Sequence, residues 1–336
     1  MKEYLQKVTS GGNLTQTEMA AAFDLIMNGE ATPAQIAALI TALRMKGETV
    51  DEIAGGAESM RRHAVFIDCA GLSVVDTCGT GGDGQNTFNI STTAALVVAG
   101  AGVPVAKHGN RAITSACGSA DVLMALGVNL DATPETVEDC VREAGIGFMF
   151  APKLHPAMKY AMGPRKELGF RTIFNMLGPL TNPAGAKGQI IGVFAPALTE
   201  PFAQVLLRLG TRRAFIVHGQ DGMDEITVTT TTRISELNNG TVKTYEFDPL
   251  SLIESYADAA ALKGGDPETN ARILKAVLAG EKGPARDIVC LNAGAAIAAG
   301  GKADSIYTGW ELAQAAIDSG RAMQALESLV ACSQGA

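Results

Sequence analysis

Residues 76–93 read DTCGTGGDGQNTFNISTT, and they decide how the rest of the chain is interpreted. A short, mainly apolar run from Leu72 to Val75 precedes them, and a helix rich in Ala and Val is predicted to begin near Ser91. Closely spaced glycines let the backbone approach a ligand, while the helix N-terminus offers free amides and the positive end of its dipole. The order of strand, glycine loop and helix therefore predicts an anion site.

Two common nucleotide-binding motifs do not fit this loop. The glycine spacing matches G-x-G-x-x-G, but no Asp or Glu lies between Asp83 and Asp121, and a dinucleotide site needs one about 20 residues on. The P-loop requires Lys followed by Ser or Thr, whereas Gln85-Asn86 follows the last glycine here. We therefore predict a phosphate or pyrophosphate site of another kind, with cations supplied by residues 107–111.

The composition indicates a large α/β protein. The 336 residues are 47% hydrophobic and can bury an ample core. A net charge of −8 argues against general nucleic-acid binding but allows a local anion site. The six cysteines form no C-x-x-C pair, so we expect free thiols in a reducing cytosol. Because residues 1–12 lack a signal-peptide pattern and no stretch resembles a membrane span, we expect a cytoplasmic protein without membrane contact.

The first 65 residues are expected to form helices only. Three capping boxes follow one another in this region: Thr15-x-x-Glu18, Thr32-Pro33-x-Gln35 and Thr49-x-x-Glu52. Apolar residues recur at helical spacing after the second box, at Ile36, Leu39, Ile40 and Leu43. This part of the chain is therefore predicted to be a helical unit.

From Leu72 onward, strand-like runs alternate with helical stretches. The strands are predicted at Val103–Ala106, Ile190–Phe194, Ala214–Val217 and Asp287–Leu291. The helices are predicted at Ser91–Ala99, Ser119–Leu126, Thr133–Ala144, Glu200–Leu209, Thr269–Ala279 and 293–301. This alternation predicts an α/β fold with a mostly parallel central sheet covered by helices. Ligands of such sheets bind at the carboxyl ends of strands, where the glycine loop and residues 107–111 both fall.

Three further segments could carry chemistry. Lys107-His-Gly-Asn-Arg111 suits phosphate oxygens, with a solvated basic turn as the alternative. Asp224-Glu225 is either surface charge or a Mg²⁺ site beside a pyrophosphate. Arg165, Lys166 and Arg171 are either a basic helix or a subsite for a smaller acidic substrate. No nucleophile motif is present, so no covalent nucleophile is expected.

Six ordered segments resemble the anthranilate phosphoribosyltransferase family, within the nucleoside phosphorylase/phosphoribosyltransferase superfamily. They are GTGGDGQNTFNIST (79–92), VAKHGNRA (105–112), GSADVL (118–123), HPAMK (155–159), RKELGFRTIFNMLGPLTNPA (165–184) and FIVHGQDGMDEIT (215–227). Together with the capped N-terminal helices and LNAGAA (291–296), the resemblance covers nearly the whole chain.

The resemblance implies transfer of 5-phosphoribosyl from phosphoribosyl pyrophosphate (PRPP) to the amine of anthranilate in tryptophan biosynthesis, with two Mg²⁺ ions in the site. It also implies a smaller all-helical domain, residues 1–70 joined by helices near 155–178, and an α/β domain, residues 71–336. A homodimer is expected to form through the helical domain.

The resemblance also assigns site residues by matched position. PRPP is expected to contact Gly79, Gly82, Asp83, Thr87, Asn89, Ser91, Thr92, Lys107, Gly109, Asn110, Arg111, Ser115 and Ser119. Mg²⁺ is expected at Ser91, Asp224 and Glu225. Anthranilate is expected at Gly79, Asn110 and Arg165, with His108 and Pro152 lining its path. The chain departs from the family pattern at Cys117, Gly163-Pro164 and Met124.

Two other functions stay open from the sequence. A pyrimidine nucleoside phosphorylase shares the implied architecture and also handles an anomeric carbon. A non-catalytic nucleic-acid-binding relative would need a basic surface and a decayed metal pair. The net charge of −8 and the intact Asp224-Glu225 pair oppose that second alternative.

Overall fold

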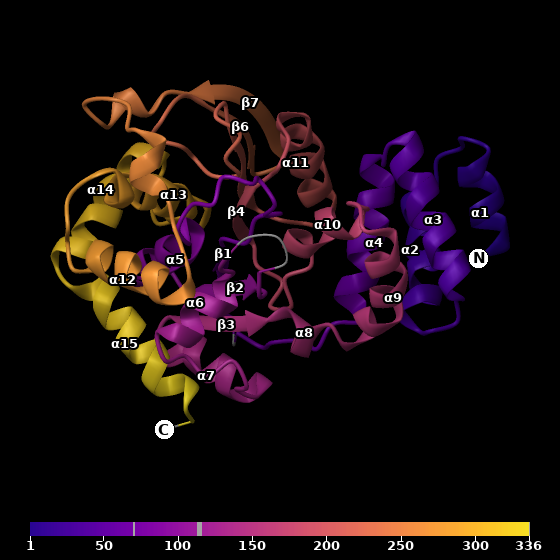
Figure 1. Ribbon diagram of the computed structural model, residues 1–336, viewed down its shortest axis with the longest axis horizontal. Coiled ribbons are helices and arrows are strands. Elements are labelled where there is room, and N and C mark those ends of the chain that lie inside the picture. The colour runs from indigo at the N-terminus through magenta and orange to yellow at the C-terminus, as the bar shows by residue number, and fades with distance from the viewer. Residues whose placement is uncertain (70, 113–115, 336) are drawn as a thin grey trace.

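The computed structural model describes residues 1–69, 71–112 and 116–335. Within this part of the chain, seven strands form one sheet in the order β3-β2-β1-β4-β5-β6-β7 (Figure 1). Strands β1 to β5 are parallel, while β6 and β7 add antiparallel pairs at one edge. The strands are β1 (Val75–Asp76), β2 (Val105–Gly109), β3 (Ile146–Phe150), β4 (Gly188–Gly192), β5 (Arg213–Gly219), β6 (Thr232–Asn238) and β7 (Thr241–Phe247).

Helices cover the sheet on both faces. They are α5 (Ile90–Gly100), α6 (Ser119–Ala125), α7 (Pro134–Glu143), α11 (Thr199–Arg208), α12 (Pro267–Leu278), α13 (Pro284–Ala299), α14 (Ile306–Asp318) and α15 (Arg321–Ser333). Because successive side chains of a strand point to opposite faces, β4 and β5 contribute to two cores. Ile190 and Phe215 pack into the core that contains α5 and α13, whereas Ile191 and Ile216 pack into the core that contains α11. Both faces are buried, as is typical of parallel sheets.

A group of helices lies to one side of the sheet (Figure 1). It consists of α1 (Lys2–Thr9), α2 (Gln16–Met27), α3 (Pro33–Lys46), α4 (Val50–Arg62) and α9 (Lys159–Leu168), with the short α8 (Ala151–Leu154) and α10 (Phe174–Leu177) nearby. Helix α9 lies against α2 and α3, far from it in sequence. The predicted fold class is confirmed, while the division into two domains at residue 70 stays a prediction. No described helix is long and apolar enough to cross a membrane.

The predicted N-terminal capping boxes are confirmed. In each box the threonine hydroxyl accepts the backbone N–H three residues on, and the Glu or Gln side chain accepts the N–H of the threonine. The predicted apolar stripe of α3 is buried: Ile36, Leu39, Ile40 and Leu43. The predicted helices of the α/β part are also present, with their ends shifted by two residues at most, except that the helix predicted at 293–301 is the second half of α13 and begins at Pro284.

The strand predicted at Asp287–Leu291 is wrong, because these residues lie in α13. Pro284 occupies the first turn of this helix, a position that proline favours. Helix α13 packs against α5, α14, β4 and β5, so nearly all of its side chains are buried. A helix without a polar face shows no helical period, and a short apolar run within it resembles a buried strand.

The other strand predictions differ from the structure in extent. Strand β2 continues to Gly109 instead of ending at Ala106, so Lys107 lies in the strand. Strands β3, β6 and β7 are additional to the predicted set. A two-residue turn at Asn239-Gly240, with φ of 46° and 89°, joins β6 to β7. Asn-Gly is the strongest short hairpin signal, so this hairpin is readable from the sequence.

Candidate active site

The candidate site lies where the parallel strands end. The glycine loop, residues 77–89, follows β1, and residues 110–118 follow β2. The Asp224-Glu225 pair comes after β5. Because these strands are parallel, their carboxyl ends meet at one edge of the sheet, the edge at which ligands of open α/β sheets bind.

Neighbouring backbone holds the glycine loop near both of its ends. The N–H of Thr80 donates to the carbonyl of Gly192, at the end of β4, over 2.8 Å. Thr87 forms an isolated antiparallel bridge with Lys263. Three glycines of the loop have positive φ angles: Gly81 (64°), Gly82 (80°) and Gly84 (74°). L side chains rarely adopt such angles, so the loop conformation itself requires glycine.

Three carboxylates lie next to this loop and the start of α5. Burial followed by repulsion from Asp83 raises the pKa of Asp224 to about 7, and the nearby N–H of Gly81 acts in the opposite direction. Burial followed by the charge of Asp224 raises the pKa of Glu225 well above its ordinary value, and the nearby N–H of Ser91 acts in the opposite direction. The three predicted metal residues Ser91, Asp224 and Glu225 are therefore brought together. Crowded carboxylates with raised pKa values are a donor set that a hard cation would stabilise.

Gly192 allows the Asp224 segment to approach the sheet. A Cβ atom at residue 192 would lie 1.5 Å from the carbonyl oxygen of Asp224. No side chain can be accommodated at that distance, so the position of the carboxylates depends on this glycine. The sequence analysis does not single out Gly192, since nothing in the sequence pairs it with Asp224.

The first turn of α5 is held by amide side chains. Asn89 precedes the helix, and its side-chain oxygen accepts a hydrogen bond from Asn270 over 2.9 Å. The amide of Asn89 donates to the carbonyl of Cys117 (3.2 Å), and the Cys117 thiol in turn lies 3.3 Å from Asn89 Oδ1. Thr92 is buried, and its hydroxyl finds no partner among the residues that the structure describes. Asn89 is thus fixed before any ligand binds.

Lys107 is more deeply buried than its predicted contact with the donor suggests. Its side chain is 2% exposed, and its ammonium donates to the hydroxyl of Thr77 over 3.1 Å. That hydroxyl donates to the carbonyl of Ser91 (2.9 Å). The charge of Lys107 lowers the pKa of Glu225, against the stronger effect of burial. Lys107 therefore compensates the carboxylates, and its direct contact with PRPP stays a prediction.

Asp76, at the end of β1, connects the strand that precedes the glycine loop to β2 and to Asn182. Its carboxylate accepts the N–H of His108 (3.1 Å) and the side-chain amide of Asn182 (2.7 Å), and burial raises its pKa to about 6. Asp76, Cys78 and His108 place possible ligand atoms within 4.8 Å of one another. Because both oxygens of Asp76 already accept hydrogen bonds, this cluster is a structural network. Neither Asp76 nor Asn182 is among the residues predicted from the sequence, although a charged residue at the end of a buried strand, such as Asp76, is a usable signal.

In the segment after β2, Asn110 and Arg111 already interact with residues of α6. Arg111 pairs with Asp121 over 3.1 Å. The carbonyl of Asn110 accepts the Ser119 hydroxyl over 3.3 Å, at the start of α6. Of the remaining predicted donor residues, Gly79 begins the loop and Gly109 ends β2, whereas Ser115, like its neighbour Thr114, lies outside the described residues.

Of the predicted acceptor residues, Arg165, His108 and Pro152 lie on α9, β2 and α8, whereas Gly79 lies in the glycine loop and Asn110 follows β2. Arg165 in α9 is partly buried, its guanidinium lies 5.1 Å from the centre of the Phe174 ring, and burial lowers its pKa. The guanidinium forms no hydrogen bond or ion pair with the described residues, while the backbone carbonyl of Arg165 accepts the N–H of Gly169. The rings of His108 and His155 are 5.1 Å apart, and burial lowers their pKa values to about 3 and about 4. Pro152 is exposed in α8.

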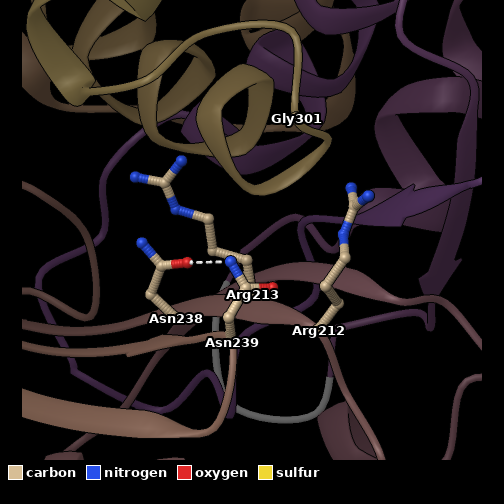
Figure 2. A pocket seen from close by; sticks show the side chains of 5 residues that line it. All are labelled: Arg212, Arg213, Asn238, Asn239 and Gly301. Atoms are coloured by element: carbon tan, nitrogen blue, oxygen red, sulfur yellow. Dashed lines mark hydrogen bonds between the residues drawn. The ribbon is translucent and has the colours of Figure 1, made fainter.

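Two pockets lie at the opposite edge of the sheet, where β5 begins. One, of about 160 Å³, is lined by Arg212, Arg213, Asn238, Asn239 and Gly301 (Figure 2). A larger one of about 500 Å³ lies against β7 and the start of α14. Arg213, which lines both, already pairs with Glu236 over 2.9 Å and donates to main-chain carbonyls. Neither pocket contains a predicted site residue.

Comparison with known proteins defines the class of this fold and site. Residues 71–323 match the a/b domain of a glycosyl transferase family, and residues 2–64 match the helical bundle domain of a glycosyl transferase family. The anthranilate phosphoribosyltransferase of Moorella thermoacetica is 56% identical over 331 residues, which cover 98% of each chain. The chain therefore belongs to the anthranilate phosphoribosyltransferase family.

Solved structures agree with this assignment. The chain resembles the crystal structure of anthranilate phosphoribosyltransferase from Thermus thermophilus with a TM-score of 0.93 and 44% identity, over 98% of this chain and 99% of that one. It also resembles the enzyme from Saccharomyces cerevisiae in complex with PRPP and Mg, with a TM-score of 0.90 and 28% identity, over 100% and 98% of the two chains.

Proposed function

We propose that this protein transfers the 5-phosphoribosyl group of PRPP to the amine of anthranilate, giving N-(5-phosphoribosyl)anthranilate and pyrophosphate in tryptophan biosynthesis. The observation that carries the proposal is the convergence of the glycine loop, the start of α5 and the two carboxylates, through the contacts Gly81–Asp224 and Ser91–Glu225. Membership of the anthranilate phosphoribosyltransferase family supports the same reaction.

Mg²⁺ is the proposed cofactor, and Ser91, Asp224 and Glu225 are its proposed protein ligands. Carboxylate and hydroxyl oxygens suit this ion, and the related yeast enzyme was solved with PRPP and Mg. We propose two ions per site. When bound, Mg²⁺ supplies positive charge that offsets the charge of the pyrophosphate leaving group.

The protein's own contribution on the donor side is binding and orientation. The amides of the loop and the N-terminal end of α5 offer fixed positive dipoles to phosphate oxygens. The proposed donor contacts are Gly79, Gly82, Asp83, Thr87, Asn89, Ser91, Thr92, Lys107, Gly109, Asn110, Arg111, Ser115 and Ser119. Because the backbone at Thr80 and the side chain of Asn89 are held before the ligand arrives, this part of the site needs little reorganisation when charge develops on pyrophosphate.

On the acceptor side, Arg165 is proposed to bind the carboxylate of anthranilate. Its guanidinium is partly buried, lies over the Phe174 ring and has no hydrogen-bond or ion-pair partner in the described chain, so a carboxylate would receive paired hydrogen bonds. Gly79 and Asn110 would orient the amine, with His108 and Pro152 along its path. An arylamine is already unprotonated near pH 7, so a strong base is unnecessary, and both His108 and His155 stay neutral there. Positioning and electrostatics then supply most of the acceleration.

The test is the disappearance of anthranilate fluorescence when PRPP and Mg²⁺ are added to the purified protein. A parallel reaction with thymidine and phosphate separates the proposal from a pyrimidine nucleoside phosphorylase. A gel-shift assay with duplex DNA tests the nucleic-acid-binding alternative. Turnover of anthranilate with PRPP, and none of thymidine with phosphate, supports the proposal. Turnover of thymidine and none of anthranilate would instead indicate a pyrimidine nucleoside phosphorylase.

We further propose a homodimer that forms through the helical unit, in a cytoplasmic protein. Met45 on α3 is 83% exposed and Met162 on α9 is 54% exposed, and these two helices pack side by side. Sedimentation velocity should give a dimer mass for the wild type. The double variant Met45→Glu, Met162→Glu should shift toward monomer, and a dimer unaffected by both changes would place the interface elsewhere.

A further inference from the structure

Arg171 connects the glycine loop to the segment that follows α9. Its guanidinium donates a hydrogen bond to the carbonyl of Gly82, in the middle of the loop. The same guanidinium lies over the ring of Phe194, 4.4 Å from the ring centroid. Stacking on an aromatic face fixes the plane of a guanidinium and therefore the direction of its donors. The sequence suggests Arg171 only for an acidic substrate, whereas its contacts in the structure are with the protein.

Phe194 is itself tied to the loop. Its backbone N–H donates to the hydroxyl of Thr80 over 3.1 Å, and the N–H of Thr80 donates to Gly192 over 2.8 Å. Thr80, Phe194, Arg171 and Gly82 thus form a closed ring of contacts. The end of β4 holds the first half of the loop, and Arg171 holds its middle.

The backbone of Arg171 is held in turn by the helical part of the protein. Arg44, on α3, donates to the carbonyl of Arg171 over 2.5 Å. The guanidinium of Arg44 lies 5.3 Å from the centre of the Phe170 ring. Residues 170 and 171 therefore lie between α3 and the glycine loop. They form the link by which the helical part contacts the middle of that loop.

We propose that Arg171 is a positioning residue, which fixes the carbonyl of Gly82 and so keeps the loop amides oriented for the phosphates of PRPP. The inference rests on the proposed function. A loop with several glycines has many accessible conformations, and ordering it on binding costs free energy. A loop ordered beforehand by Arg171 binds the donor more tightly. Arg44 acts one step further away, by holding the backbone from which Arg171 extends.

The test compares Arg171→Ala and Arg171→Lys with a matched control, Arg212→Ala. Arg212 is also an exposed arginine that donates to a glycine carbonyl, Gly300 over 3.2 Å, but it lies at the opposite edge of the sheet. We expect Arg171→Ala to raise the KM for PRPP about tenfold, the loss of one charge-assisted hydrogen bond. The KM for anthranilate should stay near its wild-type value. Arg171→Lys should recover part of the loss, because Lys keeps the charge without the stacked plane.

Hydrogen exchange of the unliganded protein gives a readout that needs no substrate. Amides of residues 80–86 should exchange faster in Arg171→Ala, to a smaller degree in Arg44→Ala, and at the wild-type rate in Arg212→Ala. Unchanged loop exchange together with an unchanged KM for PRPP in both Arg171 variants would overturn the inference, as would an equal rise in both KM values. If the wild type lacks the proposed activity, the proposed function fails, and the exchange rates still decide whether Arg171 orders the loop.

Discussion

Asp83 lies in the glycine loop close enough to Asp224, which follows β5, for its charge to raise the pKa of Asp224. Two carboxyl groups this close cannot both be ionised at low cost without a cation. Burial is the largest cause of the raised pKa of Asp224, and the charge of Asp83 is the second largest. The predicted donor loop and the predicted metal pair are therefore electrostatically coupled.

The metal pair should determine how much Mg²⁺ the reaction needs. Changing Asp224 and Glu225 to Asn and Gln removes two charged oxygen ligands from the proposed site. We expect the Mg²⁺ concentration for half-maximal turnover to rise about 10- to 100-fold, the range typical when residues that hold a metal ion or its ligands are removed. The measurement is initial rate against Mg²⁺ concentration at saturating PRPP and anthranilate.

The control for that experiment is Glu254→Gln. Glu254 is exposed, and it makes no hydrogen bond or ion pair with the rest of the described chain. Its Mg²⁺ dependence should match that of the wild type. An unchanged Mg²⁺ dependence in the Asp224, Glu225 double variant, with the fold intact by circular dichroism, would mean that the pair does not bind the ion.

The buried histidines should make the fold sensitive to mild acid. Burial lowers the pKa of His108 to about 3 and of His155 to about 4, from an ordinary 6.5. The unfolded chain takes up protons below pH 6.5 while the folded chain does not, so stability is lost as pH falls from 6.5 toward 4. Each histidine contributes a slope of up to about 1.4 kcal/mol per pH unit. Asp76 and Asp224, whose pKa values burial raises, contribute in the opposite direction over this range, so urea unfolding at pH 7.5 and pH 5 is compared between the wild type and a histidine variant.

The variant His155→Gln isolates one of these contributions. It removes a titrating group while keeping a side chain of similar size. The loss of unfolding free energy between pH 7.5 and pH 5 should be smaller in this variant than in the wild type. An identical loss in the two proteins would show that His155 is protonated in the fold at pH 5.

Arg165 should contribute to the binding of anthranilate and not to the binding of PRPP. Replacing it by Ala removes the proposed partner of the anthranilate carboxylate, at a cost of about 2 kcal/mol, or roughly thirtyfold in affinity. The affinity of Arg165→Lys for anthranilate should lie between those of the wild type and Arg165→Ala, because Lys keeps the charge but lacks the planar guanidinium. Calorimetric titration of PRPP serves as the internal control and should be unaffected. Equal weakening of both substrates would contradict the assignment to the acceptor.

Two glycines offer a matched test of the packing. Gly192→Ala would place a Cβ atom 1.5 Å from the carbonyl of Asp224, so we expect a loss of at least about 3 kcal/mol of unfolding free energy. Gly163 lies in α9 with open space around its missing Cβ. Gly163→Ala gains helix propensity but places a Cβ beside the Pro164 ring, so it should change the unfolding free energy by no more than roughly 1 kcal/mol. Thermal unfolding that is equal in the two variants would show that the Asp224 segment can move away from the sheet.

Much of the architecture could be predicted because the decisive signals are local. The threonine capping boxes fix where α2, α3 and α4 begin, and the glycines before Ser91 mark the turn from β1 into α5. Helix α13 could not be identified correctly from Asp287–Leu291, because burial on all sides removes the polar positions that reveal a helical period.

The site residues divide in the same way. The glycine loop and the acidic pair are contiguous in sequence, so their chemistry is visible there. The support around them joins distant segments: Asn182 contacts Asp76 across 106 positions, and Arg171 contacts Gly82 across 89. No periodicity or motif spacing encodes such pairs, so they required the structure.

The most direct test of the central claim is the stoichiometry of the products. The purified protein is incubated with anthranilate, PRPP and Mg²⁺, and mass spectrometry quantifies N-(5-phosphoribosyl)anthranilate while a coupled assay quantifies pyrophosphate. We predict that the two products appear in equal amounts and that neither forms when anthranilate is omitted. Pyrophosphate released without the phosphoribosylated amine, or no turnover of either substrate, would contradict the account.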